Sequence, residues 1–374
     1  MTEYFKDKRI LILSPESWGI NFVSKHHYAS LLAKMGNETY FLNPPGGAKN
    51  VEVNKIKANL YSVNYPGFFR GVGRLPRKIK DKLHGITARK ILKKIGSPDI
   101  VWSFDPYIFQ NLSLFGNKTI KIYHPVDVHY TNLEYEVAEN ADIIFTSADQ
   151  ILKKFEHLDK PKYKINHGLA DFFLNSIDSM SSLQGLGRQK VGYVGNLNYS
   201  HMNYPTLLQV VRNHPELDFY FIGPYEAGSN LGNDRIYKEE INELQSFDNA
   251  FLLGQKPASS LPALINQMDM FLMCYKVGDN IANMANPHKL LEYLSTGKVV
   301  VTHYIDEYSN RNELIEVTYT NEEFLARFDE VVNNIEKYNS EDRQEARREF
   351  ARSNAYPNQL KRIAQRITGH FYHN

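Results

Sequence analysis

Residues 269–302 read DMFLMCYKVGDNIANMANPHKLLEYLSTGKVVVT, and the fold predicted for the second half of the chain rests on these residues. The pattern predicts a buried strand, an irregular loop, a helix, a stop at Gly297 and a second buried strand. Asn286 is a good N-cap, and Pro287 at the first helical position gives up no hydrogen bond that the helix needs. This order of elements is typical of a parallel β-α-β unit.

The beginning of the predicted helix has the chemistry of an anion site. Its unpaired backbone N–H groups and the positive end of its dipole stabilise a negative group such as a diphosphate. Lys289 adds a cation in the first turn, where helices usually carry acidic residues. Glu292 follows on the same face and can accept two hydrogen bonds from a vicinal diol, such as that of a ribose. The alternative is that Lys289 and Glu292 form a solvated ion pair on a surface helix.

Short apolar runs recur along both halves of the chain, with helix-like stretches between them. They lie at residues 10–13, 39–42, 100–103, 120–123, 143–146, 191–194, 219–222, 251–253, 270–273 and 299–302. This alternation predicts an α/β fold with two parallel sheets, and the Ser- and Gly-rich residues 174–189 are typical of an interdomain linker. Because ligands of such sheets bind at the carboxyl ends of the strands, a cleft between the two domains is the expected active site.

The composition excludes several classes of protein. The 374 residues carry a net charge of +2, so the overall charge gives no support to a nucleic-acid partner. Cys274 is the only cysteine, which excludes an intrachain disulfide and a cysteine-based metal cluster and fits a reducing cytoplasm. The sequence has no D-x-D motif and no suitable H-x3-H spacing, so we expect no catalytic metal. It also has no apolar run long enough to span a membrane.

Residues 287–301, PHKLLEYLSTGKVVV, carry a family resemblance. The run resembles the P-x-K-x-x-E-Y-x-x-x-G-K-x-V-V segment of GT-B glycosyltransferases related to glycosyltransferase family 4 and to bacterial polysaccharide and teichuronic-acid-type enzymes. VGYVGN at 191–196 and HPELDFYFIGP at 214–224 extend the resemblance over residues 190–305. The resemblance implies two Rossmann-like domains that face an interdomain cleft. It also implies a glycosyltransferase without metal or cofactor, whose donor substrate is a nucleotide-sugar with UDP as the expected nucleotide.

By this resemblance, Glu292 holds the ribose of the donor, while Lys289 and the backbone near His288 bind its diphosphate. The remaining donor-binding residues implied by the resemblance are Gly195 and Asn196 beside the phosphates, Gly223, Pro287, and Gln255 with Lys256 at the base. A glycine allows close backbone approach, and the alternative role of Gly195 is that of an ordinary strand-to-loop turn.

Two alternatives to sugar transfer stay open. Many relatives carry a second glutamate eight positions before the equivalent of Glu292, where this chain has Met284. The carboxylate that would contact the sugar is therefore missing. A catalytically inactive nucleotide-sugar-binding module is one alternative, and a nucleotide-sugar 2-epimerase, which shares the fold, is the other.

The first half of the chain is expected to bind the acceptor. Asp127 follows a predicted strand and resembles an acidic position of these enzymes, and Asp105 competes with it as the base that removes the proton of the attacking hydroxyl. His27 is a third catalytic candidate. A turn or N-cap role is the alternative for each aspartate, and His27 would otherwise only decorate a helix. The expected domains are residues 1–180 for the acceptor and 187–350 for the nucleotide-sugar, with 351–374 as a C-terminal helix packing back on the first domain.

Residues 70–96, RGVGRLPRKIKDKLHGITARKILKKIG, are strongly basic, with Asp81 as the only acid. The apolar residues at helical spacing in this segment are Leu75, Ile79, Leu83 and Ile86. Such a stretch predicts either a helix lying on an anionic membrane surface or a solvated helix whose apolar stripe belongs to the core. A glycan or lipid-linked acceptor in bacterial surface polysaccharide synthesis is the expected partner. The expected location is the cytoplasm, peripherally on the inner face of the cell membrane.

Overall fold

The chain folds into two compact units. The structure, a computed structural model, describes residues 3–19, 22–129, 131–174, 183, 185, 187–225, 237–278 and 285–371. Unit 1 consists of residues 1–167 and 356–374, and unit 2 consists of residues 168–355. The sequence placed the first boundary near residue 180, whereas the chain passes into unit 2 after His167 and returns to unit 1 after Ala355. Most of the Ser- and Gly-rich segment 174–189 lies outside the described residues.

Unit 1 contains a sheet with the strand order β3-β4-β2-β1-β5-β6-β7-β8. Its strands are β1 (Arg9–Leu13), β2 (Glu38–Leu42), β3 (Gly47–Lys57), β4 (Leu60–Pro66), β5 (Ile100–Ser103), β6 (Ile120–Tyr123), β7 (Ile143–Thr146) and β8 (Lys162–Lys164). Neighbouring strands are parallel except for the antiparallel pair β3 and β4. β5 and β7 are buried at every position, which is why their apolar runs predict them. β3 is mostly exposed and polar, so the sequence does not predict it.

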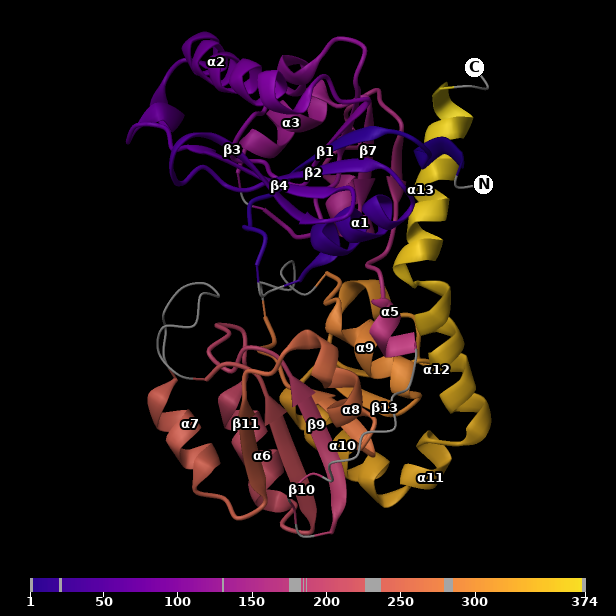
Figure 1. Cartoon of the computed structure of the whole chain (residues 1–374). Helices are drawn as coiled ribbons and strands as arrows, with labels where there is room; N and C mark the ends of the chain where they lie inside the picture. The colour runs from indigo at the N-terminus through magenta and orange to yellow at the C-terminus, as the bar shows by residue number, and fades with distance from the viewer. Residues whose placement is uncertain are drawn as a thin grey trace. The chain divides into compact units, whose positions relative to one another are not determined.

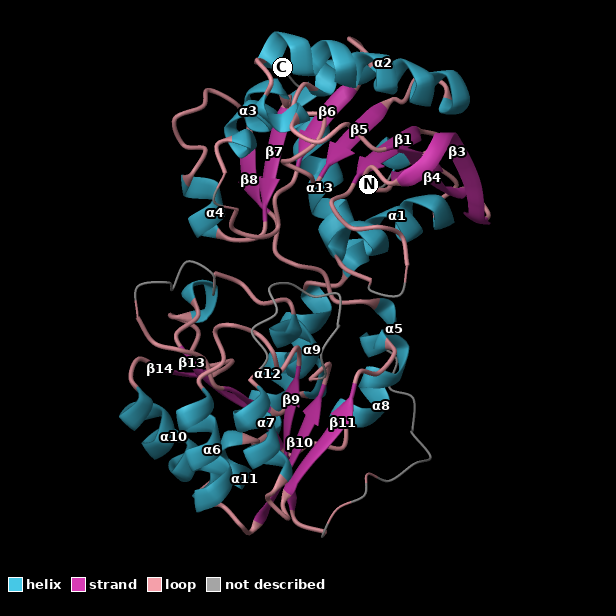
Figure 2. Cartoon of the chain, turned by 90° about the vertical axis from the view of Figure 1, so that its left-hand side faces the viewer, coloured by secondary structure: helices cyan, strands magenta, loops and turns pink. Residues whose placement is uncertain are grey.

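Helices from both ends of the chain complete unit 1 (Figure 2). They are α1 (Ser24–Lys34), α2 (Arg77–Ile95), α3 (Leu133–Asn140), α4 (Asp149–Lys153) and α13 (Tyr356–Phe371), with short 3₁₀ turns η1 (Glu3–Phe5), η2 (Val72–Arg74) and η3 (Leu112–Phe115). The C-terminal helix α13, yellow in Figure 1, joins this unit through Tyr356. The Tyr356 ring stacks on His27 with centroids 4.6 Å apart, and its hydroxyl donates to Ser24 Oγ at 3.2 Å.

Unit 2 contains a fully parallel sheet with the order β11-β10-β9-β12-β13-β14. Its strands are β9 (Gln189–Val194), β10 (Leu217–Ile222), β11 (Ala250–Gly254), β12 (Met270–Met273), β13 (Val299–His303) and β14 (Glu316–Thr318). Its helices are α5 (Asp171–Leu174), α6 (Tyr204–Asn213), α7 (Lys238–Gln245), α8 (Leu261–Ile265), α9 (Lys289–Thr296), α10 (Asn321–Asn333), α11 (Ile335–Tyr338) and α12 (Glu341–Ser353), with 3₁₀ turns η4 (Ala258–Ser260) and η6 (Asp306–Tyr308). The parallel α/β prediction is therefore confirmed in both units.

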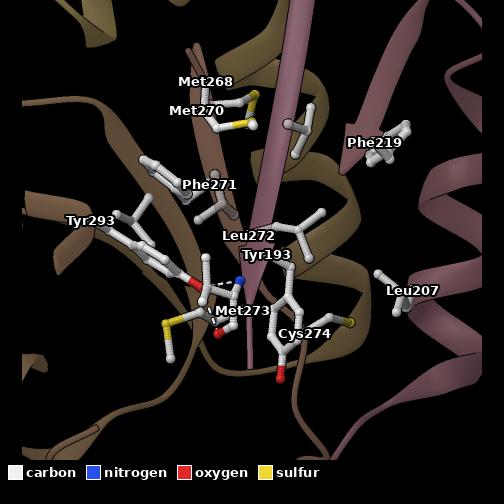
Figure 3. Packing of buried hydrophobic residues seen from close by; sticks show 14 of the residues in the cluster. Tyr193, Leu207, Phe219, Met268, Met270, Phe271, Leu272, Met273, Cys274 and Tyr293 are labelled. Carbon is white, nitrogen blue, oxygen red and sulfur yellow. Dashed lines mark hydrogen bonds between the residues drawn. The ribbon is translucent and has the colours of Figure 1, made fainter. Parts of the chain in front are cut away.

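The core of unit 2 ties α9 to the middle of its sheet. The rings of Phe271 on β12 and Tyr293 on α9 stack with centroids 4.2 Å apart and planes 5° from parallel (Figure 3). Leu290, Leu291 and Leu294 complete the buried side of the helix. One face of α9 packs against the sheet and the opposite face does not. Lys289 and Glu292 lie outside the packed face, at the edge of this core.

Candidate functional site

The strand order of unit 2 reverses direction between β9 and β12. From β9 the chain proceeds to β10 and β11 on one side, and it then adds β12, β13 and β14 on the other. Open parallel sheets bind ligands at the carboxyl ends of the strands at such a point, because the connections that follow the two strands diverge there. The segment after β9 begins with Gly195, and the connection after β12 leads into α9. Gly195 and α9, the two parts of the predicted donor site, therefore follow β9 and β12, the strands between which the order reverses.

Two glycines allow the ends of β9 and β10 to pack tightly. Gly195 N donates to Ile222 O at 2.9 Å, and Gly223 N donates to Gly254 O at 3.0 Å. A Cβ atom on Gly223 would lie under 3.0 Å from the Gly195 carbonyl, and one on Gly195 would lie under 3.0 Å from Lys289 Nζ. Their φ angles of 155° for Gly195 and 154° for Gly223 also disfavour other residues. Gly195 therefore makes room for Lys289 and does more than turn the chain.

The ammonium group of Lys289 lies beside two tyrosine rings. Its Nζ is 4.8 Å from the ring centroid of Tyr193 and 5.8 Å from that of Tyr275, and it is 3.5 Å from the Tyr193 hydroxyl. Burial lowers the pKa of the ammonium to about 8, although the nearby Glu292 carboxyl opposes this shift. A desolvated cation gains free energy when an anion binds beside it, so this group is suited to a phosphate.

The carboxyl group of Glu292 lies one helical turn further and is largely buried, with 17% of its side chain exposed. Its Oε1 is 3.9 Å from His288 Nε2, and within the described chain no salt bridge joins it to Lys289. Burial raises the pKa of Glu292 to about 7, against the opposing effect of Lys289. The two groups are neither well solvated nor paired with each other. The simple surface ion pair, one of the two interpretations of the sequence, is therefore wrong.

Helix α9 begins later than the sequence predicts. Its first residue is Lys289, and His288 stands at the N-cap without a side-chain capping bond. The carbonyl groups of Pro287 and His288 accept bonds from the N–H groups three residues ahead, each at 3.1 Å. Such bonds are typical of a tight 3₁₀ turn, which here precedes the regular helix, and the cap at Asn286 stays a prediction. The predicted stop is confirmed, because Gly297 ends the helix with a φ of 82°.

Helix α9 is held at its middle and at its C-terminal end. The Tyr293 hydroxyl accepts a bond from Val194 N at 2.7 Å and donates one to Val194 O at 3.1 Å, at the end of β9 (Figure 3). At the C-terminal end, the buried guanidinium of Arg347 on α12 donates to Gly297 O at 3.0 Å. The helix therefore has a fixed place relative to the carboxyl end of β9.

The other predicted donor residues lie around the same edge of the sheet. Asn196 follows β9, and its Oδ1 accepts from Asn198 N at 2.9 Å. Gln255 and Lys256 follow β11 and are exposed. Their roles toward the phosphates and the base stay predictions. Met284, where many relatives carry a glutamate, lies outside the described residues.

The three catalytic candidates of unit 1 have different surroundings. Asp105 is buried and accepts from Tyr107 N at 2.7 Å, which is a turn role, and burial raises its pKa to about 6. Burial, with a smaller effect of His26, lowers the pKa of His27 to about 4. Asp127 follows β6 and is exposed. Asp127 is therefore the candidate that a substrate reaches most easily, while all three catalytic roles stay predictions.

Sequence reasoning does not single out the tyrosines of the site. Tyr193 and Tyr275 reach Lys289 from β9 and from the segment after β12, and Tyr293 anchors α9. One signal was available in the sequence. A buried tyrosine needs a partner for its hydroxyl, and Tyr193 stands in an otherwise apolar run two residues before Gly195.

Neither a metal cluster nor a membrane span is found in the described part of the chain. No group of three or more His, Cys, Asp and Glu side chains there could hold a metal ion. Within the same residues, no helix is both long and apolar enough to cross a membrane.

Comparison with known proteins finds similar structures. No family model and no curated protein matches the chain. A sucrose-phosphate synthase from Thermosynechococcus elongatus has a TM-score of 0.73 at 11% identity, over 98% of this chain and 100% of that chain. A UDP-forming α,α-trehalose-phosphate synthase from Burkholderia xenovorans has a TM-score of 0.70 at 13% identity, over 96% and 98%. Anabaena HepE, in complex with UDP and glucose, has a TM-score of 0.69 at 13% identity, over 96% and 99%.

At these identities the likeness establishes the fold. It extends over nearly the whole length of each chain, and it agrees with the two parallel sheets and with the strand reversal in unit 2. Kinship with glycosyltransferase family 4 stays a prediction. The chain has the GT-B fold of two Rossmann-like domains, as the sequence predicts.

Proposed function

We propose that this protein is a metal-independent glycosyltransferase that takes its sugar from a nucleotide-sugar, with UDP as the nucleotide. One observation carries the proposal: Lys289 and Glu292 are largely buried, unpaired with each other, and placed after the strand at which the sheet order reverses. Two of the similar structures support the choice of nucleotide, because one is UDP-forming and the other contains UDP and glucose.

In the proposed reaction, unit 2 binds the donor. Lys289 contacts the diphosphate, Gly195 lets the phosphates approach the backbone, and Glu292 accepts hydrogen bonds from the ribose hydroxyls. The bond between the anomeric carbon and the diphosphate oxygen breaks, and its electron pair leaves with the diphosphate. A cation fixed at the leaving group stabilises the charge that develops there, so Lys289 lowers the barrier without a metal ion.

The acceptor supplies the new bond to the anomeric carbon through a hydroxyl oxygen, and a base removes the hydroxyl proton. Asp127 is the exposed candidate for this base, with Asp105 and His27 as the other candidates. We propose a glycan or lipid-linked acceptor in the synthesis of a bacterial surface polysaccharide. The proposed place of action is the cytoplasm, on the inner face of the cell membrane. The basic segment 70–96 supports this part of the proposal.

Calorimetry with UDP, GDP and ADP tests the donor site. We expect UDP to bind to the wild-type protein and binding to be lost in Glu292→Ala and in Lys289→Ala. Lys153→Ala, an exposed lysine of unit 1, is a matched control that should bind UDP as the wild type does. Unchanged UDP affinity in Glu292→Ala would overturn the assignment of the ribose-binding carboxylate.

Product analysis separates transfer from its two alternatives. Incubation with UDP-N-acetylglucosamine alone yields the manno epimer if the protein is a 2-epimerase. UDP binding without sugar transfer or donor hydrolysis, across several donors and acceptors, identifies an inactive binding module. Transfer to an added glycan or lipid-linked acceptor is the result that we expect.

A further inference from the structure

Helix α2 exposes two apolar residues for which the sequence left a place in the core open. Its buried residues are Lys80, His84, Ala88, Ile91 and Ile95. Ile79 and Ile86 lie outside this face, with 48% and 46% of their surface exposed. Ile79 and Ile86 therefore do not belong to the apolar stripe that packs in the core, to which the second interpretation of this segment assigned them. Exposed apolar side chains become informative when they lie together beside a polar rim, because such patches are typical of interaction sites.

The two isoleucines share one line along the helix. They are seven residues apart, which is nearly two turns at about 3.6 residues per turn, so their side chains leave the helix in almost the same direction. The same geometry places Lys82 and Lys93 on one side of this line and Lys90 on the other. We define the outer face of α2 as Lys78, Ile79, Lys82, Ile86, Arg89, Lys90, Lys93 and Lys94, all of which are exposed.

The cations of the outer face are not neutralised by the described residues of the protein. Arg77 and Lys80, at the margin of the buried face, take the nearby acids: Arg77 lies 3.7 Å from Glu139, and Lys80 lies 3.4 Å from Glu136. No lysine or arginine of the outer face forms a salt bridge with a described residue. The outer face is thus a strip of unpaired positive charge with an apolar line along its middle.

The segment that leads into α2 also exposes an aromatic ring and basic residues. Phe69 is 58% exposed, and Arg70 and Arg74 beside it are exposed as well. Figures 1 and 2 show α2 along the margin of unit 1, where none of the described helices of that unit lies over it. An exposed aromatic ring next to basic residues is typical of a surface that meets the boundary between lipid headgroups and acyl chains.

We propose that the outer face of α2, together with Phe69, docks on an anionic lipid bilayer. The lysines and arginines bind lipid headgroups, while Ile79, Ile86 and Phe69 enter the layer below them. A nucleic acid would bind the same cations through its phosphates, but it would make little apolar contact with Ile79 and Ile86. The bilayer therefore matches the surface better. The docking itself is independent of the donor site. The biological role of docking rests on the proposed function, because a docked enzyme would lie at the membrane that contains a lipid-linked acceptor.

Vesicle sedimentation with the full chain tests the proposal. We expect binding to vesicles of phosphatidylcholine mixed with phosphatidylglycerol, and little binding to phosphatidylcholine alone. Lys82→Gln/Lys93→Gln should weaken binding at least tenfold, since each lysine near an anionic surface contributes about fivefold. Ile79→Ser/Ile86→Ser keeps every charge and should also weaken binding at least tenfold. Lys55→Gln/Lys57→Gln, which removes the same charge from exposed positions of β3, is the matched control.

Each outcome decides the question. The proposal fails if the wild type does not prefer anionic vesicles, or if the α2 lysine variant binds as the β3 control does. Binding that depends on the lysines but not on the isoleucines, and that duplex DNA competes away, identifies a nucleic-acid surface instead. UDP calorimetry on every variant shows whether the protein is folded and whether the donor site works, so that failure of docking and failure of the proposed function are distinguished.

Discussion

The hydroxyl group of Tyr293 acts as a sheet partner for Val194. Strand β12 pairs with β9 only as far as Phe271 and Gly192. Gly195 N donates to Ile222 O on β10. Since backbone groups of successive residues point to opposite sides of a strand, the N–H and C=O groups of Val194 face the β12 side. The pairing with β12 has already ended there. The Tyr293 hydroxyl bonds to both groups and satisfies them without another strand. The residue after Glu292 thereby fixes the helix of the proposed donor site to β9, the strand that Gly195 follows.

Replacing Tyr293 by phenylalanine removes these two bonds while keeping the ring. Two buried backbone groups lose their partner, so we expect the free energy of unfolding to fall by about 1–3 kcal/mol. UDP affinity should fall as well, because α9 is no longer tied to β9. Tyr338→Phe is the control, since its hydroxyl also makes two hydrogen bonds, to Glu330 and Arg327. Denaturant unfolding and UDP calorimetry check both effects, and a loss of affinity equal to that of the control would contradict the anchoring role.

The pH dependence of UDP binding should have a maximum. A phosphate binds protonated Lys289, whose pKa is about 8, so affinity is full below this pH and is lost as pH rises through it. A ribose diol binds ionised Glu292, whose pKa is about 7, so affinity is lost as pH falls through that value. The optimum therefore lies between these pKa values.

Calorimetry across this pH range gives the profile. The side chain of Glu292→Gln has no charge that could change with pH. UDP affinity of this variant should therefore no longer fall toward acidic pH, while it should still fall toward alkaline pH. A profile that is flat on both sides of neutral pH would show that neither group titrates on binding.

Lys289 should destabilise the unliganded protein. Its pKa is lowered from 10.5 to about 8 on folding, so the folded state disfavours the charged form. At about 1.4 kcal/mol per pKa unit, and with allowance for partial exposure, Lys289→Met should stabilise the protein by roughly 1–3 kcal/mol at pH 7 while UDP binding is lost. The unfolded state binds the proton more tightly, so wild-type stability rises with pH between these two pKa values and the advantage of the variant shrinks. Thermal unfolding at several pH values checks the prediction, and an equally stable or weaker variant at pH 7 refutes it.

The two glycines at the strand ends should respond differently to alanine. In Gly223→Ala the new Cβ meets the rigid backbone of Gly195, so we expect a loss of more than about 2 kcal/mol of stability. In Gly195→Ala it meets the flexible end of Lys289 and the hydroxyl of Tyr193, which are side-chain atoms and can shift more easily than backbone, so the stability loss should be smaller while UDP affinity falls strongly. Gly73→Ala, which has open space around its Cβ position, is the neutral control. Similar stabilities of Gly195→Ala and Gly223→Ala would argue against this packing.

Local sequence signals were enough to predict the α/β class, the buried strands and the helix that ends at Gly297. These features rest on local rules, because a strand buried on both faces must be apolar and a left-handed helix end favours glycine. The motif from Pro287 to Val301 also led to the GT-B fold through its family resemblance. By contrast, the exposed strand β3 has no such local signal.

The groups that surround the candidate site come together through contacts between distant segments, which local signals do not predict. Tyr193 and Lys289 are far apart in the sequence, and the sheet order brings them together because β9 and β12 are neighbours. Burial also depends on distant segments. Ile79 and Ile91 are equally apolar, yet Ile79 is exposed and Ile91 is buried. The reason is that the elements packed against a helix determine which of its faces is buried. Composition and periodicity act over a few residues, whereas desolvation of Lys289 and exposure of Ile79 depend on atoms that distant segments supply.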